Sequence, residues 1–251
     1  MNECRKLSEE LMTSLELKLP PIAIAFCDAA PPNVSTFGST APAGCAFWQH
    51  AAKRTFTTTA KDHELCSIGV HTHHLAGASP AQAGELQEAL QAMIGLDYVR
   101  ADEVGSIPVL EREVKHAVYG PLSEFPIPPQ IVLLFAHARQ GLILSEAVSR
   151  VDGDAPLALG RPACAVVPQV MSHGRAAMSL GCCGARAYLD ALSDDVALWA
   201  FPAEKLAEYT REIGVLARAN ATLSVFHRRR RQDVQSGMRP SVRESLERCI
   251  S

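Results

Sequence analysis

Short apolar runs alternate along this chain with longer segments in which apolar residues recur at helical spacing. Two runs, Ile22–Phe26 and Ile131–Phe135, are continuous and short enough to be buried strands. Further strands are expected at 55–59, 116–119, 176–180 and 196–201. No run approaches the roughly 18 apolar residues that a membrane span requires. The pattern therefore indicates a globular chain built on a sheet.

Helical periodicity lies between these runs. The clearest helix start is at Ser79, because Pro80 suits the first helical position and Gln82 completes a capping box; Gly95 is a natural stop. Other helices are expected before residue 20 and at 45–53, 141–150, 163–171 and 202–219. The elements alternate without the strict rhythm of a doubly wound nucleotide fold. We expect an α+β (or irregular α/β) fold, with a mixed sheet flanked by helices.

Length and charge set the domain organisation. The chain has 251 residues, 47% of them hydrophobic, which is enough for one compact core. We expect a single α+β domain over residues 1–225, containing a cysteine-lined site, followed by a basic C-terminal segment with a short helix over 226–251. The basic run Arg228–Arg231 has no interleaved aromatic residues, which is typical of a solvated segment.

The overall charge also bears on partners and location. The net charge of −3 gives no global attraction to nucleic acid or to an anionic membrane, so neither is expected as a partner. Residues 1–18 carry four glutamates and lack the basic, apolar and small-residue pattern of a secretory signal. We expect a cytoplasmic protein.

Eight cysteines are many for a chain expected in the reducing cytosol, where ligation or catalysis is more common than disulfide bonding. Five of them lie in four segments rich in glycine, proline or aromatic residues, namely 42–48, 63–69, 160–164 and 179–186, the last of which holds the doublet Cys182-Cys183. Glycines beside a cysteine allow backbone N–H groups to approach a thiolate. There is no Cys-x-x-Cys pair, so zinc-ribbon and ferredoxin motifs do not apply. The spacing alone fits both a metal site and four incidental buried cysteines.

Six segments together resemble the family catalogued as domain of unknown function 169, over about Leu17 to Ala219. The segments are Leu19–Ile24, Gly44–Trp48, His63–Gly69, Tyr119–Leu122, Gly160–Cys164 and Ser179–Cys182. The resemblance implies a soluble prokaryotic protein, often met in anaerobes, whose recurring cysteines suit an iron–sulfur cluster. It implies no known reaction.

Residues and resemblance together suggest a 4Fe-4S cluster bound by Cys45, Cys66 and Cys182, with Cys164 the leading fourth ligand; zinc is the alternative. In the doublet Cys182-Cys183 either sulfur could bind, and Cys182 is preferred because Gly181 precedes it as in the family pattern. The fourth ligand decides the class of function. An open iron suits a Lewis acid, whereas a fully ligated cluster suits electron transfer or sensing.

His63 and Arg186 are the catalytic candidates beside these cysteines. His63 could supply a proton, and Arg186 could hold an anionic substrate or form a structural ion pair. The hypothesis is an iron–sulfur-dependent reductase or lyase, desulfurase-like, that removes sulfur or another heteroatom group from a small molecule. The alternative is a non-enzymatic electron carrier or redox sensor that serves a partner protein. A homodimer is compatible with either.

Several other histidines and cysteines could bind metal or take part in redox chemistry, but each also has a structural explanation. His71 and His73 would share one face if they lay on a strand, but a polar loop is also expected there. Cys4 and Cys249 lie near the termini and are not expected to bind metal, and Cys27 is a reserve candidate. A redox pair formed by Cys182 and Cys183 would require a strained vicinal disulfide.

Overall fold

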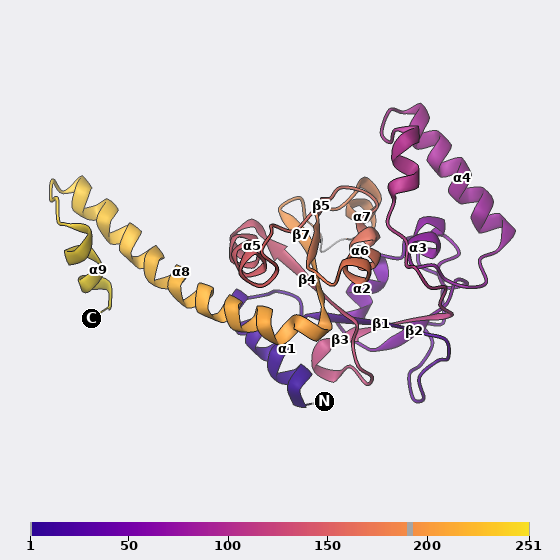
Figure 1. Ribbon diagram of the computed structural model, residues 1–251, viewed down its shortest axis with the longest axis horizontal. Coiled ribbons are helices and arrows are strands. Elements are labelled where there is room, and N and C mark those ends of the chain that lie inside the picture. Colours follow the sequence, from indigo (N-terminus) through magenta and orange to yellow (C-terminus); the bar gives the residue numbers. More distant parts are fainter. Residues whose placement is uncertain (1, 190–192, 251) are drawn as a thin grey trace.

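The computed structural model describes residues 2–189 and 193–250, and its central feature is a seven-stranded mixed sheet (Figure 1). The strand order is β2-β3-β1-β4-β7-β6-β5. The strands are β1 (Ile22–Cys27), β2 (Phe56–Thr58), β3 (His116–Pro121), β4 (Ile131–His137), β5 (Ala158–Leu159), β6 (Ala177–Ser179) and β7 (Val196–Pro202). The expected α+β class with a mixed sheet is confirmed.

The two apolar runs that stood out in the sequence form adjacent central strands. β1 pairs antiparallel with β3 on one side and β4 on the other, so that Ile24 lies opposite both Tyr119 and Ile131. β4 in turn pairs with β7 along its whole length. Among the described strands, only β5 and β6 pair in parallel. The sheet is therefore mostly antiparallel, with one parallel edge.

Helices cover both faces of the sheet. α1 (Asn2–Leu15), α5 (Ala138–Asp152) and α8 (Leu206–Gln235) pack on one face. The helices on the other face are α2 (Ala46–Ala51), α3 (Ser67–Thr72), α6 (Val166–His173) and α7 (Cys183–Tyr188). β4 shows why both faces are covered, because Ile131 and Leu133 point into one core and Val132 and Leu134 into the other.

Several helices differ from the sequence expectation. α3 and α7 were not expected, and the helix expected at 163–171 divides into a 3₁₀ turn, η3 (Ala163–Ala165), and α6. The remaining 3₁₀ segments are η1 (Ala101–Ser106), η2 (Leu122–Glu124) and η4 (Ala203–Lys205). α8 continues to Gln235, so the domain boundary expected after residue 225 falls inside a continuous helix.

Two helical segments project from the layered body (Figure 1). One is α4 (Pro80–Gly95), whose expected capping box between Ser79 and Gln82 is present. The other is the far half of α8, against which α9 (Val242–Ile250) folds back. The buried Asp233 on α8 accepts a hydrogen bond from Arg248 on α9 at 2.9 Å and fastens this hairpin. None of the described helices combines the length and apolarity needed to cross a membrane.

Candidate functional site

Four of the eight cysteines lie on the same face of the sheet, each at the start of a helix. Cys45 precedes α2, Cys66 precedes α3, Cys164 lies in η3 before α6, and Cys182 precedes α7. All four belong to one apolar cluster, in which three are buried and Cys182 is half-buried at the edge. Segments distant in sequence thus bring four thiols to one region of the core.

These thiols lie close enough to affect one another's ionisation. Burial raises the pKa of Cys45 to about 12, and Cys66 and Cys182 add to the rise. Burial also raises the pKa of Cys66. The pKa of Cys164 is raised well above the ordinary thiol value, chiefly by burial, and Cys66, Cys45 and Cys182 add to this rise. Buried thiols placed together in this way keep their protons unless a cation compensates the charge of the thiolates.

Two glycines make room for the Cys66 sulfur. A Cβ atom at Gly69 would lie 2.9 Å from Cys66 Sγ, and one at Gly44 would lie 3.1 Å from His63 Cδ2 and 3.7 Å from Cys66 Sγ. Backbone N–H groups of both glycines point to Cys66 and act to lower its pKa. Gly44 and Gly69 therefore give the Cys66 sulfur both room and backbone N–H groups, as expected of glycines near a cysteine. Gly181 differs, because its φ of +83° serves a turn packed against Arg186.

The other sulfurs also have hydrogen-bond donors. Thr72 Oγ1 donates to Cys164 Sγ at 3.2 Å, and the backbone N–H of Ala185 donates to Cys182 Sγ at 3.4 Å. The backbone N–H of Ala46 lies near the Cys45 sulfur and acts to lower its pKa. Such donors stabilise negative charge on sulfur, which is what a thiolate ligand carries.

The side chains are not arranged as a closed metal site. Within residues 2–189 and 193–250, no group of three or more His, Cys, Asp or Glu side chains is placed so that it could hold a metal ion. A cysteine redirects its sulfur by rotation about χ1 alone, so the chemistry of the donor set still fits a thiophilic metal.

His63 is the residue of greatest chemical interest beside the thiols. Its ring is fully buried, and Nδ1 lies 2.9 Å from the Thr59 carbonyl oxygen, which can only accept. Nδ1 therefore carries the proton and Nε2 the lone pair. Burial lowers the pKa of His63 to about 4, so the ring is neutral at pH 7. This favours an acceptor or ligand role over the expected supply of a proton.

Aromatic residues wall the site on the side of the sheet. Phe47 and Trp48 are both fully buried, and the Phe47 ring packs edge-on against His63 at 4.7 Å. Beyond them His73, weighed with His71 as a possible pair, is fully buried, with Nδ1 3.4 Å from the Tyr119 hydroxyl. His71 is exposed on α3 and His73 directly follows this helix, so the two do not share a strand face, and a helix stands where the polar loop was expected to begin.

The two arginines near the site are committed to structural contacts. Arg186 donates to the backbone carbonyls of Leu180, Ser193 and Val196, and it thereby ties the Cys182 loop to β7. This placement favours the structural explanation over substrate binding. Arg161 stacks over the Tyr98 ring at 4.4 Å and lies 3.6 Å from Glu103.

The edge at Cys182 is the side of the site that solvent reaches. Cys183 is exposed, and a contact with the Tyr98 side chain raises the Tyr98 pKa. Tyr98 comes from the segment that follows α4, so this projection borders the edge of the thiol cluster. No disulfide joins Cys182 and Cys183, since both are free thiols.

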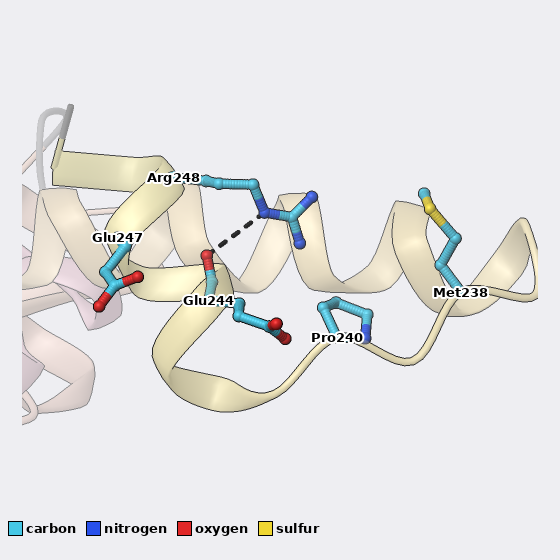
Figure 2. A pocket seen from close by; sticks show the side chains of 5 residues that line it. All are labelled: Met238, Pro240, Glu244, Glu247 and Arg248. Carbon is cyan, nitrogen blue, oxygen red and sulfur yellow. Dashed lines mark hydrogen bonds between the residues drawn. The ribbon is translucent and has the colours of Figure 1, made fainter.

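The remaining cysteines lie apart from this cluster. Cys4 and Cys27 pack at the core on the opposite face of the sheet, and Cys249 Sγ contacts the Ser245 carbonyl oxygen on α9. Two hollows in the described part of the chain also lie away from the clustered cysteines. One is beside α9, where Figure 2 shows Arg248 Nε donating to the backbone oxygen of Glu244. Another lies between α5 and α6, next to Asp152 and Arg175. Neither is lined by a cysteine.

The family profile DUF169, described as an uncharacterised ArCR, matches residues 10–212. The chain belongs to the DUF169 family. The match spans the sheet, the four cysteines and His63, and it ends within α8, before the hairpin that α8 forms with α9. No curated protein and no solved structure matches the chain.

Proposed function

We propose that Cys45, Cys66 and Cys182 bind an iron–sulfur cluster of the 4Fe-4S type, and that the chain uses it to act on a small molecule. The observation that supports the proposal is the gathering of buried thiols from separate segments in one cluster, with hydrogen-bond donors at the sulfurs. Cys164 lies in the same cluster and is the leading candidate for the fourth position.

The donor set narrows the choice of metal. Sulfur ligands in an apolar setting suit iron–sulfur clusters and zinc, and they do not suit magnesium or calcium. Phe47 and Trp48 keep water from the side of the sheet, which is a known influence on reduction potential. The alternative is a zinc site, which contains no inorganic sulfide. Metal and sulfide analysis distinguishes it from an iron–sulfur cluster.

When bound, a 4Fe-4S cluster supplies electron transfer, and an iron without a protein ligand supplies a Lewis acid for a sulfur or other heteroatom. The half-buried Cys182 edge is the side from which a substrate would approach, with Tyr98 and Cys183 beside it. Reductive removal or lyase-type elimination of a heteroatom group is the class of reaction to test. The buried thiol of Cys164 favours the second candidate, a fully ligated electron carrier or redox sensor.

Metal analysis of protein purified without oxygen tests the proposal. We expect about four irons and four sulfides per chain, broad visible absorbance, and an electron paramagnetic resonance signal on reduction. Cys45→Ala, Cys66→Ala and Cys182→Ala should each lose most of the iron. Cys27→Ala, on the other face of the sheet, is the matched control and should retain it. Protein that contains no metal would refute the proposal.

Cys164→Ala separates the two candidate functions. Loss of the whole cluster from this variant indicates four cysteine ligands and supports a carrier or sensor. Retention of the iron indicates that the fourth position is not filled by Cys164, and it directs the search toward a bound substrate or another ligand.

A further inference from the structure

One buried polar atom beside the thiols lacks a partner. His63 Nε2 is an acceptor in a fully buried ring, and nothing in residues 2–189 and 193–250 donates a hydrogen bond to it. A buried acceptor left unpaired loses the hydrogen bonds it would make with water, and native proteins rarely leave one without reason. The atom is therefore placed for a partner that the polypeptide does not provide.

The ring is held in the tautomer that a metal ligand requires. Nδ1 donates to the Thr59 carbonyl oxygen at 2.9 Å, and Thr59 is itself held by Asp62, whose Oδ2 accepts from the Thr59 amide at 2.8 Å and from its hydroxyl at 2.9 Å. Phe47 packs edge-on against the ring and restricts its rotation. A histidine that binds metal characteristically donates its other ring N–H to a carbonyl or carboxylate in this way.

The free edge of the ring shares a space with the Cys66 sulfur. A Cβ atom built at Gly44 would lie 3.5 Å from His63 Nε2 and 3.7 Å from Cys66 Sγ. One built at Gly69 would lie 2.9 Å from the same sulfur and 3.5 Å from His63 Cδ2. The absence of side chains at both glycines leaves the Cδ2–Nε2 edge facing the sulfur without intervening atoms from these positions.

From these contacts we infer that His63 Nε2 is the fourth protein ligand of the group held by Cys45, Cys66 and Cys182. The inference rests on the proposed function and refines it, because it assigns a mixed sulfur and nitrogen ligand set. Cys164 then remains a thiol, hydrogen-bonded by Thr72, at the buried side of the site. A nitrogen ligand in place of sulfur raises the reduction potential of an iron–sulfur centre.

His73 provides a matched comparison. It is equally buried and its Nε2 also lacks a partner among the described residues, but its Nδ1 faces the Tyr119 hydroxyl. Neither Gly44 nor Gly69 has His73 among its near neighbours. A substitution of His73 therefore disturbs the same core without removing the nitrogen that faces Cys66.

Pulsed electron paramagnetic resonance of the reduced, iron-loaded full chain tests the assignment. With 15N-labelled histidine, we expect a strong nitrogen coupling that changes with the isotope, persists in His73→Phe and disappears in His63→Ala. Because His63→Ala could also lose the cluster, His63→Cys is the second variant. It should retain the iron, lack the nitrogen coupling and have a lower reduction potential than the wild type.

The outcomes separate this inference from the proposed function. Iron-loaded protein without a strong nitrogen coupling overturns the His63 assignment and leaves the cluster proposal standing. Unchanged coupling and potential in His63→Cys would also overturn it. Protein that binds no iron or zinc refutes the cluster proposal, and the assignment of His63 with it.

Discussion

At the scale of single residues, the sequence predicted which cysteines come together but not what surrounds their sulfurs. Glycine next to cysteine was a usable signal for Gly44 and Gly69, because only a residue without a side chain fits against Cys66. The burial of His73 and the three backbone contacts of Arg186 could not be predicted. They depend on residues far away in sequence, such as Tyr119 and Val196.

Gly69→Ala tests the close approach. The new Cβ would lie 2.9 Å from Cys66 Sγ, so we expect a loss of about 1–3 kcal/mol in the free energy of unfolding, as in other overpacked cores, together with most of the bound iron. Gly84→Ala is the control, because a Cβ there meets open space within α4 and should stabilise the chain by about 0.5–1 kcal/mol. Urea unfolding and iron content measure both. Equal iron content in the two variants would contradict this explanation.

The buried His73 predicts a pH dependence of stability in the metal-free chain. Burial lowers its pKa to about 3, below the unfolded value of 6.5, so the unfolded state binds a proton first as the pH falls. Stability should therefore be fully present above about pH 6.5 and decline between there and about pH 3, by several kcal/mol. His73→Phe should make this decline shallower and leave the part contributed by the buried His63, whose pKa is about 4, whereas His227→Phe, at an exposed position on α8, should leave the decline unchanged. The urea midpoints of the wild type and both variants, measured across this pH range, test the prediction. Parallel pH profiles for the wild type and His73→Phe would exclude His73 as a cause of the decline.

At the scale of elements, continuous apolar runs and clear capping signals were predictable, and so were some short elements such as α2 within 45–53, but two other short helices were not. β1 and β4 have continuous apolar runs, and α4 has a capping box that only its own residues determine. α3 and α7 have six residues each, which is too short for a periodic pattern, and they form where the chain packs against the core. The helices that follow Cys66 and Cys182 therefore could not be predicted.

Gln82 connects α4 with the segment that precedes Cys66. Its Oε1 accepts a hydrogen bond from the backbone N–H of Ser79, the N-cap of α4. Its Nε2 donates to the carbonyl oxygens of Ala60 at 2.9 Å and His63 at 3.3 Å. Gln82→Glu keeps the capping oxygen but removes both donors and buries a charge, so we expect a loss of about 2–3 kcal/mol in the free energy of unfolding. Hydrogen exchange should also increase over residues 60–66. Gln87→Glu, exposed on the same helix, is the control, and similar exchange in both variants would argue against the connection.

At the scale of the whole molecule, the projections of α4 and of the α8 and α9 hairpin leave more surface exposed than a compact chain of this size has. The chain exposes 13048 Å², whereas a compact monomer of 27.0 kDa exposes about 10,800 Å². The excess is larger than the roughly 800 Å² that each partner contributes to a standard interface. Leu223 and Val234 are each 46% exposed, and their spacing of about three helical turns puts them on one side of α8.

We therefore expect a second copy of the chain to cover this side of the hairpin, and the wild type to be a dimer by sedimentation and light scattering. Leu223→Glu combined with Val234→Glu places like charges on the apolar stripe and should yield a monomer with unchanged iron content, because the hairpin lies outside the layered body that carries the four clustered cysteines (Figure 1). Leu96→Glu, on the opposite projection and 79% exposed, is the control and should remain dimeric. A wild type that stays monomeric at every concentration would show that the hairpin does not join two copies.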